Sequence, residues 1–324
     1  MLYDDNLKGF IRMKRVLVSA VLFCILINAG CSKNQPEDSR IVTHSHKEKG
    51  DIVMKQNLLC LMLAYPENII GVECDENGWV YVAMKSGKRI LYDDKRTKTY
   101  DEKMETPDLQ DMMEQGYPLY DIDNLLDKGN DPGRVRVYAM LKEVYGESRK
   151  QIEANLVTVR FGYKNCRFNS SNKAAESLKK AGVELTELIN KHKSVSAFIY
   201  PVGGTYSYRL ISGTNRLSAH SFGTAVDLSV SKYDYWKWAS REQGQKRLDS
   251  YPKEIVRVFE NNGFIWGGKW GHFDIMHYEY RPELIFKSRY FAGKPLSDEC
   301  WFKGIETEDA DIKNYIQLID KALK

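Results

Sequence analysis

Two short segments of the chain contain residue types that bind metal ions and transfer protons. In the run SAHSFGTAVDL, six residues separate His220 from Asp227, and in the run FDIMHYE, Asp274 stands three residues before His277. Imidazole nitrogens and carboxylate oxygens are good zinc ligands. Because a zinc ion with three protein ligands keeps a fourth position for water, these residues predict metal-assisted hydrolysis.

The first segment needs a turn to bring its two groups together. Gly223 lies between His220 and Asp227, and the run TAVDLSV that follows is typical of a strand. A glycine turn lets His220 fold back over the start of that strand, so that imidazole and carboxylate converge on one ion. On the strand, Asp227 shares a face with the small residues Ala225 and Ser229, which leave room for a metal and its water.

The second segment also requires a turn. Residues three apart on a regular strand face opposite sides, so Asp274 and His277 share a pocket only if the chain turns at Asp274 and enters a strand near His277. Glu279 then lies on the strand face of His277 and can orient it as an outer carboxylate. With His220, Asp227 and His277 on the metal, Asp274 stays unligated and can accept the proton of an activated water.

At these residues the chain resembles the M15 family of zinc peptidases, which includes D,D-carboxypeptidases and L-alanyl-D-glutamate endopeptidases. SAHSFGTAVDL is similar to the family signature S-x-H-x-x-G-x-A-x-D-L, and DIMHYE is similar to its second element, D/E-x-x-H followed by an aromatic residue. The resemblance covers roughly residues 195–285. It implies one zinc ion on His220, Asp227 and His277, Asp274 as catalytic base, and the stem peptides of peptidoglycan as substrate.

The family also uses an arginine ahead of the first histidine to polarise the substrate carbonyl. Arg209 ends a strand-like run and is our candidate for this role, with Arg216 as the alternative. Aspartate rather than glutamate as the base resembles the endopeptidase branch and some carboxypeptidase-like relatives. The cleaved bond, D-Ala-D-Ala or L-Ala-D-Glu, stays open, because a carboxypeptidase needs a cation for the terminal carboxylate and an endopeptidase needs an open groove.

The alternative from another functional class is a catalytically silent lipoprotein that binds the cell wall. Every position that the resemblance gives a role holds a competent residue, which argues against it. His272 donates a hydrogen bond to the reaction intermediate or, as we favour, lines the cleft. A group of aromatic residues forms a glycan-stacking surface or, as we favour, core and pocket wall. This group consists of Tyr235, Trp236, Trp238, Trp266 and Trp270.

Residues 1–30 predict an export signal. Residues 16–27 are apolar apart from Ser19, and Met-Lys-Arg stands before them. A helix of that length spans roughly 18 Å, short of the ~30 Å hydrocarbon core of a bilayer, so we interpret it as a secretory signal and not as a spanning anchor. The exit, INAGCS, resembles a bacterial lipobox, although Asn28 stands where an aliphatic residue is usual. The resemblance implies a lipid on Cys31; the alternative is an ordinary cleaved signal.

We therefore expect an exported lipoprotein that is held at the membrane by its N-terminal lipid, faces the cell wall or periplasm, and acts as a monomer. Peptidoglycan lies in that compartment, which agrees with the chemistry. The net charge of +4 comes from 48 basic and 44 acidic residues, so composition gives no support for nucleic-acid binding.

The cysteines allow several interpretations. Four of them follow the lipobox, and in an oxidising compartment they allow three pairings between which the sequence cannot choose. They are Cys60, Cys74, Cys166 and Cys300. The chain has no CxxC motif, which argues against a structural zinc site built from cysteines.

The periodicity of the remaining chain predicts an α+β fold rather than alternating βαβ units. We expect a small antiparallel sheet flanked by helices, which carries the zinc site, and an N-terminal α+β extension. The predicted strands are 79–84 and 89–94 as a hairpin, 155–161 and 194–201; the predicted helices are 131–148, 170–193, 251–264 and 309–323. The predicted regions are a signal peptide (1–30), a lipid-anchored polar linker (31–55), an N-terminal α+β region (56–150), the peptidase domain (151–295) and a C-terminal helix (296–324).

Overall fold

The computed structural model describes residues 38–293 and 300–324. The predicted signal peptide and the lipidation site Cys31 lie outside the described residues. Residues His44–Lys324 form one compact unit, which contains both motifs. Within the described ranges, no helix is long and apolar enough to cross a membrane.

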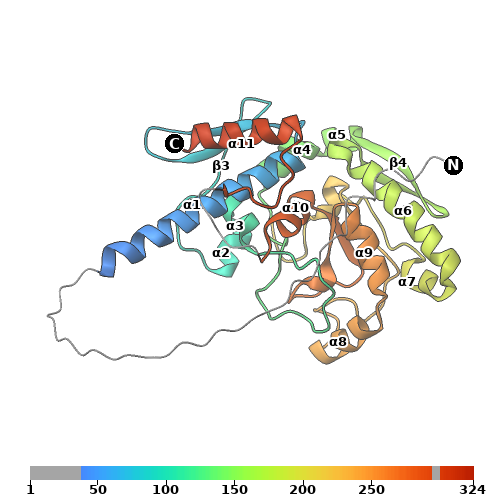
Figure 1. Cartoon of the computed structure of the whole chain (residues 1–324). Coiled ribbons are helices and arrows are strands. Elements are labelled where there is room, and N and C mark those ends of the chain that lie inside the picture. The colour runs from blue at the N-terminus through green and yellow to red at the C-terminus, as the bar shows by residue number, and fades with distance from the viewer. Residues whose placement is uncertain (1–37, 294–299) are drawn as a thin grey trace, which may run out of the picture. The chain divides into compact units, whose positions relative to one another are not determined.

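The described residues form an α+β fold with three small antiparallel sheets (Figure 1). Their orders are β1-β2-β3, β4-β5 and β6-β8-β7. The strands are β1 (Ile69–Cys74), β2 (Val80–Met84), β3 (Arg89–Leu91), β4 (Leu156–Phe161), β5 (Lys164–Asn169), β6 (Ala225–Asp227), β7 (Phe264–Trp266) and β8 (His277–Tyr280). The helices are α1 (Asp38–Ala64), α2 (Tyr100–Glu105), α3 (Leu109–Glu114), α4 (Tyr138–Tyr145), α5 (Arg149–Ala154), α6 (Ala174–Lys191), α7 (Ser196–Ile199), α8 (Arg241–Ser250), α9 (Lys253–Asn261), α10 (Pro282–Phe291) and α11 (Ala310–Ala322).

The central sheet β6-β8-β7 is supported by helices on an aromatic core. α6 packs against β4, β5 and α9, and α9 packs against β7. Phe259 on α9 contacts Phe161 of β4, Phe264 of β7 and Tyr278 of β8 through ring pairs 4.0–6.3 Å apart. Buried aromatic pairs of this kind hold short strands in place, so the sheet that carries the second motif has a rigid base.

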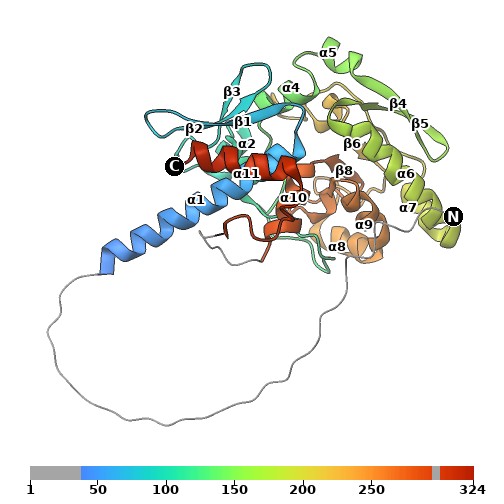
Figure 2. The same ribbon diagram turned by 45° about the horizontal axis from the view of Figure 1, so that its top comes forward.

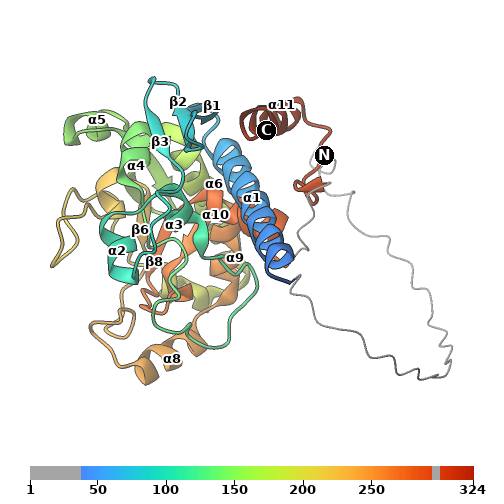
Figure 3. The ribbon, with the colours of Figure 1, turned by 90° about the vertical axis from the view of Figure 1, so that its left-hand side faces the viewer.

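The C-terminal helix α11 packs against elements from the N-terminal part of the chain. α11 lies beside β1, next to the β1–β3 sheet (Figures 2 and 3). Lys55 of α1 pairs with Asp320 of α11 at 3.0 Å, and Gln56 donates a hydrogen bond to the carbonyl of Trp301. Part of the predicted linker (31–55) is helical, because α1 begins at Asp38.

Most predicted elements are present. The 79–84 and 89–94 hairpin forms as β2 and β3, with β1 added, and the helix predicted over 170–193 forms as α6. The strand predicted over 194–201 is wrong, because this run forms a 3-10 turn and α7. Its buried members, Val195 and Ile199, are four residues apart, which is helical rather than strand spacing.

The helix predicted over 131–148 is also partly wrong, because α4 begins only at Tyr138. The preceding residues form an extended loop that packs against β7 and α10. Gly133 has a φ of +90°, and a Cβ there would stand 2.3 Å from Ile265 and 2.8 Å from Leu284. Only glycine fits this position, and the loop runs on from it to the site described below.

Two further predictions concern the pairing of the cysteines and the division of the chain into regions. Cys60, Cys74, Cys166 and Cys300 are all free, so none of the three pairings is formed. The regions 56–150 and 151–295 lie within the same compact unit, His44–Lys324.

Candidate active site

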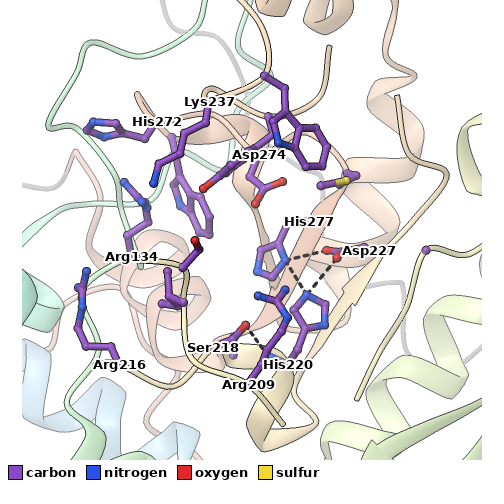
Figure 4. Close-up of a pocket in the computed structure, with 18 of the residues that line it drawn as sticks. Arg134, Arg209, Arg216, Ser218, His220, Asp227, Lys237, His272, Asp274 and His277 are labelled. Atoms are coloured by element: carbon purple, nitrogen blue, oxygen red, sulfur yellow. Dashed lines mark hydrogen bonds and ion pairs between the residues drawn. The ribbon is translucent and has the colours of Figure 1, made fainter. Parts of the chain in front are cut away.

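The two motifs line one pocket of about 520 Å³, shown in Figure 4. A 3-10 turn, β6 and the start of β8 carry His220, Asp227 and His277 into it. The lining also includes Arg134, from the loop before α4, and Lys237, from the loop before α8. The pocket is therefore built from segments that lie far apart in the sequence.

Strand pairing brings Asp227 and His277 together. β6 and β8 are antiparallel, and Asp227 is directly opposite His277. The side chains of directly opposed residues project from the same face, with Cβ atoms about 4.5–5.5 Å apart. His277 Nδ1 lies 2.9 Å from Asp227 Oδ1. The turn at Asp274 and the entry into a strand at His277, which the spacing required, are both present.

The 3-10 turn Ala219–Phe222 brings in the third group. Gly223 ends this turn with a φ of 68°, the left-handed region that favours glycine. His220 Nδ1 lies 2.6 Å from the carbonyl oxygen of Thr205. Since a carbonyl only accepts, Nδ1 is the donor, and Nε2 is left facing Asp227 Oδ2 at 3.2 Å.

The spacing of these three groups fits a tetrahedral metal site. His220 Nε2 lies 3.3 Å from His277 Nδ1, and the two nitrogens lie 3.2 and 2.9 Å from the oxygens of Asp227. Two zinc ligands at 2.0–2.1 Å from the ion and at the tetrahedral angle stand about 3.3–3.4 Å apart. The three donors are thus separated by nearly the distances that one ion requires.

An outer ion pair holds His277. Its Nε2 lies 3.8 Å from the carboxylate of Glu279, which shares the buried face of β8. Arg136 forms two hydrogen bonds with Glu279, one of them from Nε to Oε1 at 2.8 Å. Burial alone would raise the pKa of Glu279, but the Arg136 guanidinium holds it well below its usual range. Glu279 therefore carries a charge that can orient the histidine ring.

Asp274 is the second carboxylate of the pocket, beside Asp227. Its Oδ1 is buried and has no hydrogen-bond partner among the described residues. Burial raises the pKa of this carboxyl to about 6, although the neighbouring His277 opposes the shift. A buried polar atom without a partner is costly in a folded protein, and such an atom beside a donor cluster points to a ligand or a reacting group.

The two candidate arginines differ in their partners. Arg209 is exposed and lines the pocket, and its guanidinium makes no hydrogen bond or ion pair within the described ranges. In Figure 4 it points toward the two histidine rings. Arg216 also lines the pocket, but it donates a hydrogen bond to the carbonyl of Met104 and lies 3.4 Å from Glu105. Of these two arginines, Arg209 is the one available to a substrate.

His272 and the aromatic group occupy different parts of this region. The Nδ1 of His272 lies 2.7 Å from the carboxylate of Asp131, and its ring lines the pocket. Trp266 is core, because its indole N–H donates to the carbonyl of Ile275 and its ring is buried. Trp236 packs edge-on against His272. The pocket is lined by Tyr235, Trp238 and Trp270.

Lys237 and three residues within 131–136 belong to the site but were not predicted from the sequence. Asp131 holds His272, Arg134 lines the pocket, and Arg136 pairs with Glu279. This run, DPGRVR, lies at the start of the predicted helix 131–148. A Pro-Gly pair is a turn signal, and two arginines spaced by two indicate an extended segment that directs both to one side; those were the available signals.

Comparison with known proteins agrees with this geometry. A family model described as D-alanyl-D-alanine carboxypeptidase matches residues 212–280, which span both motifs. The chain is 30% identical over 113 residues to the peptidoglycan L-alanyl-D-glutamate endopeptidase CwlK of Bacillus subtilis (strain 168). That alignment covers 34% of this chain and 67% of the relative. No solved structure matches the chain significantly.

Proposed function

Since the chain belongs to the M15 family of peptidases, we propose that it is a zinc-dependent peptidase that cleaves the stem peptides of peptidoglycan. One observation carries the proposal above the others. Two histidine nitrogens and an aspartate stand at the separations of tetrahedral zinc ligands, next to a buried carboxylate oxygen that has no partner in the described structure. That combination supplies both a metal site and a base.

The metal would be held by His220 Nε2, His277 Nδ1 and the carboxylate of Asp227. When bound, zinc lowers the pKa of a water to about 7 and polarises a carbonyl. The protein fixes the direction of its ligands through outer contacts, Thr205 on one histidine and Glu279 on the other. Such outer contacts typically change metal affinity by about 10- to 100-fold.

Asp274 would act as general base and then as general acid. Its unpartnered Oδ1 accepts the proton of the attacking water, and the same carboxyl returns that proton to the leaving amine. Burial suits it to both steps, because a carboxyl with a pKa raised to about 6 is ionised at neutral pH and yet basic enough to accept a proton.

Arg209 would stabilise the negative charge that develops on the carbonyl oxygen. Its exposed guanidinium points toward the histidines and has no partner in the described structure that competes for it. A donor that meets the oxyanion of the transition state contributes more to the rate than one that meets only the ground-state carbonyl. Arg216 is tied to Met104 and Glu105, so it is the weaker candidate.

We place this activity outside the cytoplasm, with residues 1–30 as an export signal and Cys31 as the lipid-bearing residue of a monomeric lipoprotein. Peptidoglycan lies in that compartment. Two peptide bonds remain as candidates for cleavage, D-Ala-D-Ala and L-Ala-D-Glu. The matched family is described as a D-alanyl-D-alanine carboxypeptidase, and the relative CwlK is an L-alanyl-D-glutamate endopeptidase. The competing function is a silent, wall-binding lipoprotein.

Mass spectrometry of digested muropeptides tests the proposal. Protein lacking residues 1–31 is incubated with purified muropeptides as the zinc-loaded form, after treatment with a chelator, and after zinc is restored. We expect loss of D-Ala or scission of L-Ala-D-Glu, abolished by the chelator and regained with zinc. Binding to peptidoglycan without any cleavage by the zinc-loaded protein would favour the wall-binding lipoprotein instead.

A further inference from the structure

The pocket contains more positive charge than the proposed chemistry uses. Its ionised lining comprises two acids, Asp227 and Asp274, and five cations, namely Arg134, Arg136, Arg209, Arg216 and Lys237. Arg136 is neutralised by Glu279, and Arg216 is held by Met104 and Glu105. With Arg209 assigned to the carbonyl oxygen, Arg134 and Lys237 remain without a role.

Arg134 is fixed at one end and open at the other. Its Nη1 donates a hydrogen bond to the Tyr100 hydroxyl at 3.0 Å and lies 3.5 Å from the carboxylate of Asp131. The guanidinium also stands 5.8 Å from the ring centre of Trp270. Its Nε and Nη2 donate to no group in the described part of the chain. Asp131 is shared with Tyr100 and His272, so it offsets Arg134 only in part.

Lys237 supplies a second cation, which is exposed. Its Nζ lies 5.3 Å from the ring centre of Trp236 and forms no ion pair with any described acid. In Figure 4, Lys237 and Arg134 extend into the pocket on one side of Asp274, and His277 and Asp227 lie on the other. Arg134 also acts on the pKa of Asp274, where it opposes the larger effect of burial. The two cations thus stand near the carboxyl that returns a proton to the leaving amine.

The two candidate substrates share one feature at this place. In D-Ala-D-Ala the residue that supplies the leaving amine carries the terminal carboxylate on its Cα. In L-Ala-D-Glu, where the glutamate continues the peptide through its γ-carboxyl, that residue carries a free α-carboxylate. Either way, a carboxylate is bonded to the Cα next to the scissile nitrogen. A group that protonates this nitrogen therefore lies close to the carboxylate, and a cation there offsets the repulsion from Asp274.

Resting on the proposed function, we propose that Arg134 and Lys237 form a subsite for the free α-carboxylate of the residue that supplies the leaving amine. Arg134 presents a planar, pre-oriented donor edge, and Lys237 closes over the anion as a flexible point charge. The subsite draws Arg134 from the N-terminal region, outside the matched residues 212–280. It makes that region part of substrate recognition.

Amidated substrates test the subsite. Two pairs are compared: a stem peptide ending in D-Ala-D-Ala against its C-terminal amide, and an L-Ala-γ-D-Glu peptide against the same peptide with the α-carboxylate amidated. We expect wild-type kcat/KM to be about 10- to 100-fold higher on the free acid of the pair that is cleaved, the range for a charged hydrogen bond. The pair that responds identifies which carboxylate is bound.

Lys237→Met should remove most of this preference, with a far larger loss on the free acid than on the amide, and Lys237→Arg should restore it. Arg134→Met should act in the same way. Lys232→Met is the matched control, because Lys232 is an exposed lysine of the same loop that does not line this pocket. This variant should prefer the free acid over the amide as strongly as the wild type does.

The outcomes separate the two proposals. Equal rates on acid and amide by an active wild-type enzyme, or a Lys237→Met loss that is the same on both, would overturn the subsite and leave the peptidase proposal intact. Failure to cleave any of the four peptides would instead contradict the peptidase proposal itself.

Discussion

The two halves of the pocket were built in different ways. One half, the 3-10 turn with β6 and β8, carries its functional groups within two motifs, and the register Asp227–His277 brings them together. The other half includes the loop 131–136, which has no motif and is held at the site by hydrogen bonds with residues 272, 279 and 281. Chemistry that depends on local spacing can be recognised in a sequence, whereas groups that support it from a distance cannot.

The contact that joins the two halves most tightly is the buried pair of Arg136 and Glu279, so its removal should have the largest effect on stability. Arg136→Met leaves the Glu279 charge buried without its bidentate partner, and we expect a loss of about 3–5 kcal/mol in the free energy of unfolding. Urea unfolding with zinc-free protein measures it.

The double variant Arg136→Met/Glu279→Gln is the control, and it should recover part of that stability because no charge is left unpaired. Zinc affinity gives an independent measurement, since a looser His277 should bind zinc about 10- to 100-fold more weakly. Unchanged stability and unchanged zinc affinity in Arg136→Met would show that the loop does not support the metal half.

Arg209 and Arg216 lie in the same pocket but should respond in opposite ways. Arg209→Met should lower kcat about 100- to 1000-fold, the cost of losing one oxyanion donor, and leave the unfolding free energy unchanged because the side chain is exposed. Arg216→Met should cost about 1 kcal/mol of stability through the lost bond to Met104. Steady-state kinetics with urea unfolding separates the two, and the reverse pattern would assign the carbonyl role to Arg216.

A loss of stability smaller than that of Arg136→Met is expected where the loop packs against the core at Gly133. Gly133→Ala would place a Cβ 2.3 Å from Ile265, and we expect overpacking to cost about 1–3 kcal/mol of unfolding free energy, in addition to strain at positive φ. Gly129→Ala is the matched control, because Gly129 has a φ of +87° and nothing within 4 Å of its would-be Cβ. Equal unfolding free energies for the two variants would mean that the loop is not packed as described.

The same contrast explains how much of the fold could be predicted. Helix α6 and the β2–β3 hairpin follow from periodicity and a turn signal, and the turn at Asp274 follows from the spacing of two functional groups. Residues 194–201 form a short apolar run in which periodicity does not separate strand from helix.

The helix predicted over residues 131–136 was wrong for a different reason. These residues are extended because partners more than a hundred positions away hold them, Glu279 for Arg136 and His272 for Asp131. Local pattern carries no information on such partners, so tertiary packing decided this segment.

Zinc content measured together with turnover, for two variants, tests the central claim most directly. His220→Ala removes a proposed ligand, and Asp274→Asn removes the proposed base while it preserves the shape of the side chain. We predict that Asp274→Asn keeps one zinc per chain and loses about 100- to 10,000-fold in kcat on stem peptides, whereas His220→Ala loses both the metal and activity. A fully active Asp274→Asn, or a His220→Ala variant that retains its zinc, would contradict the account.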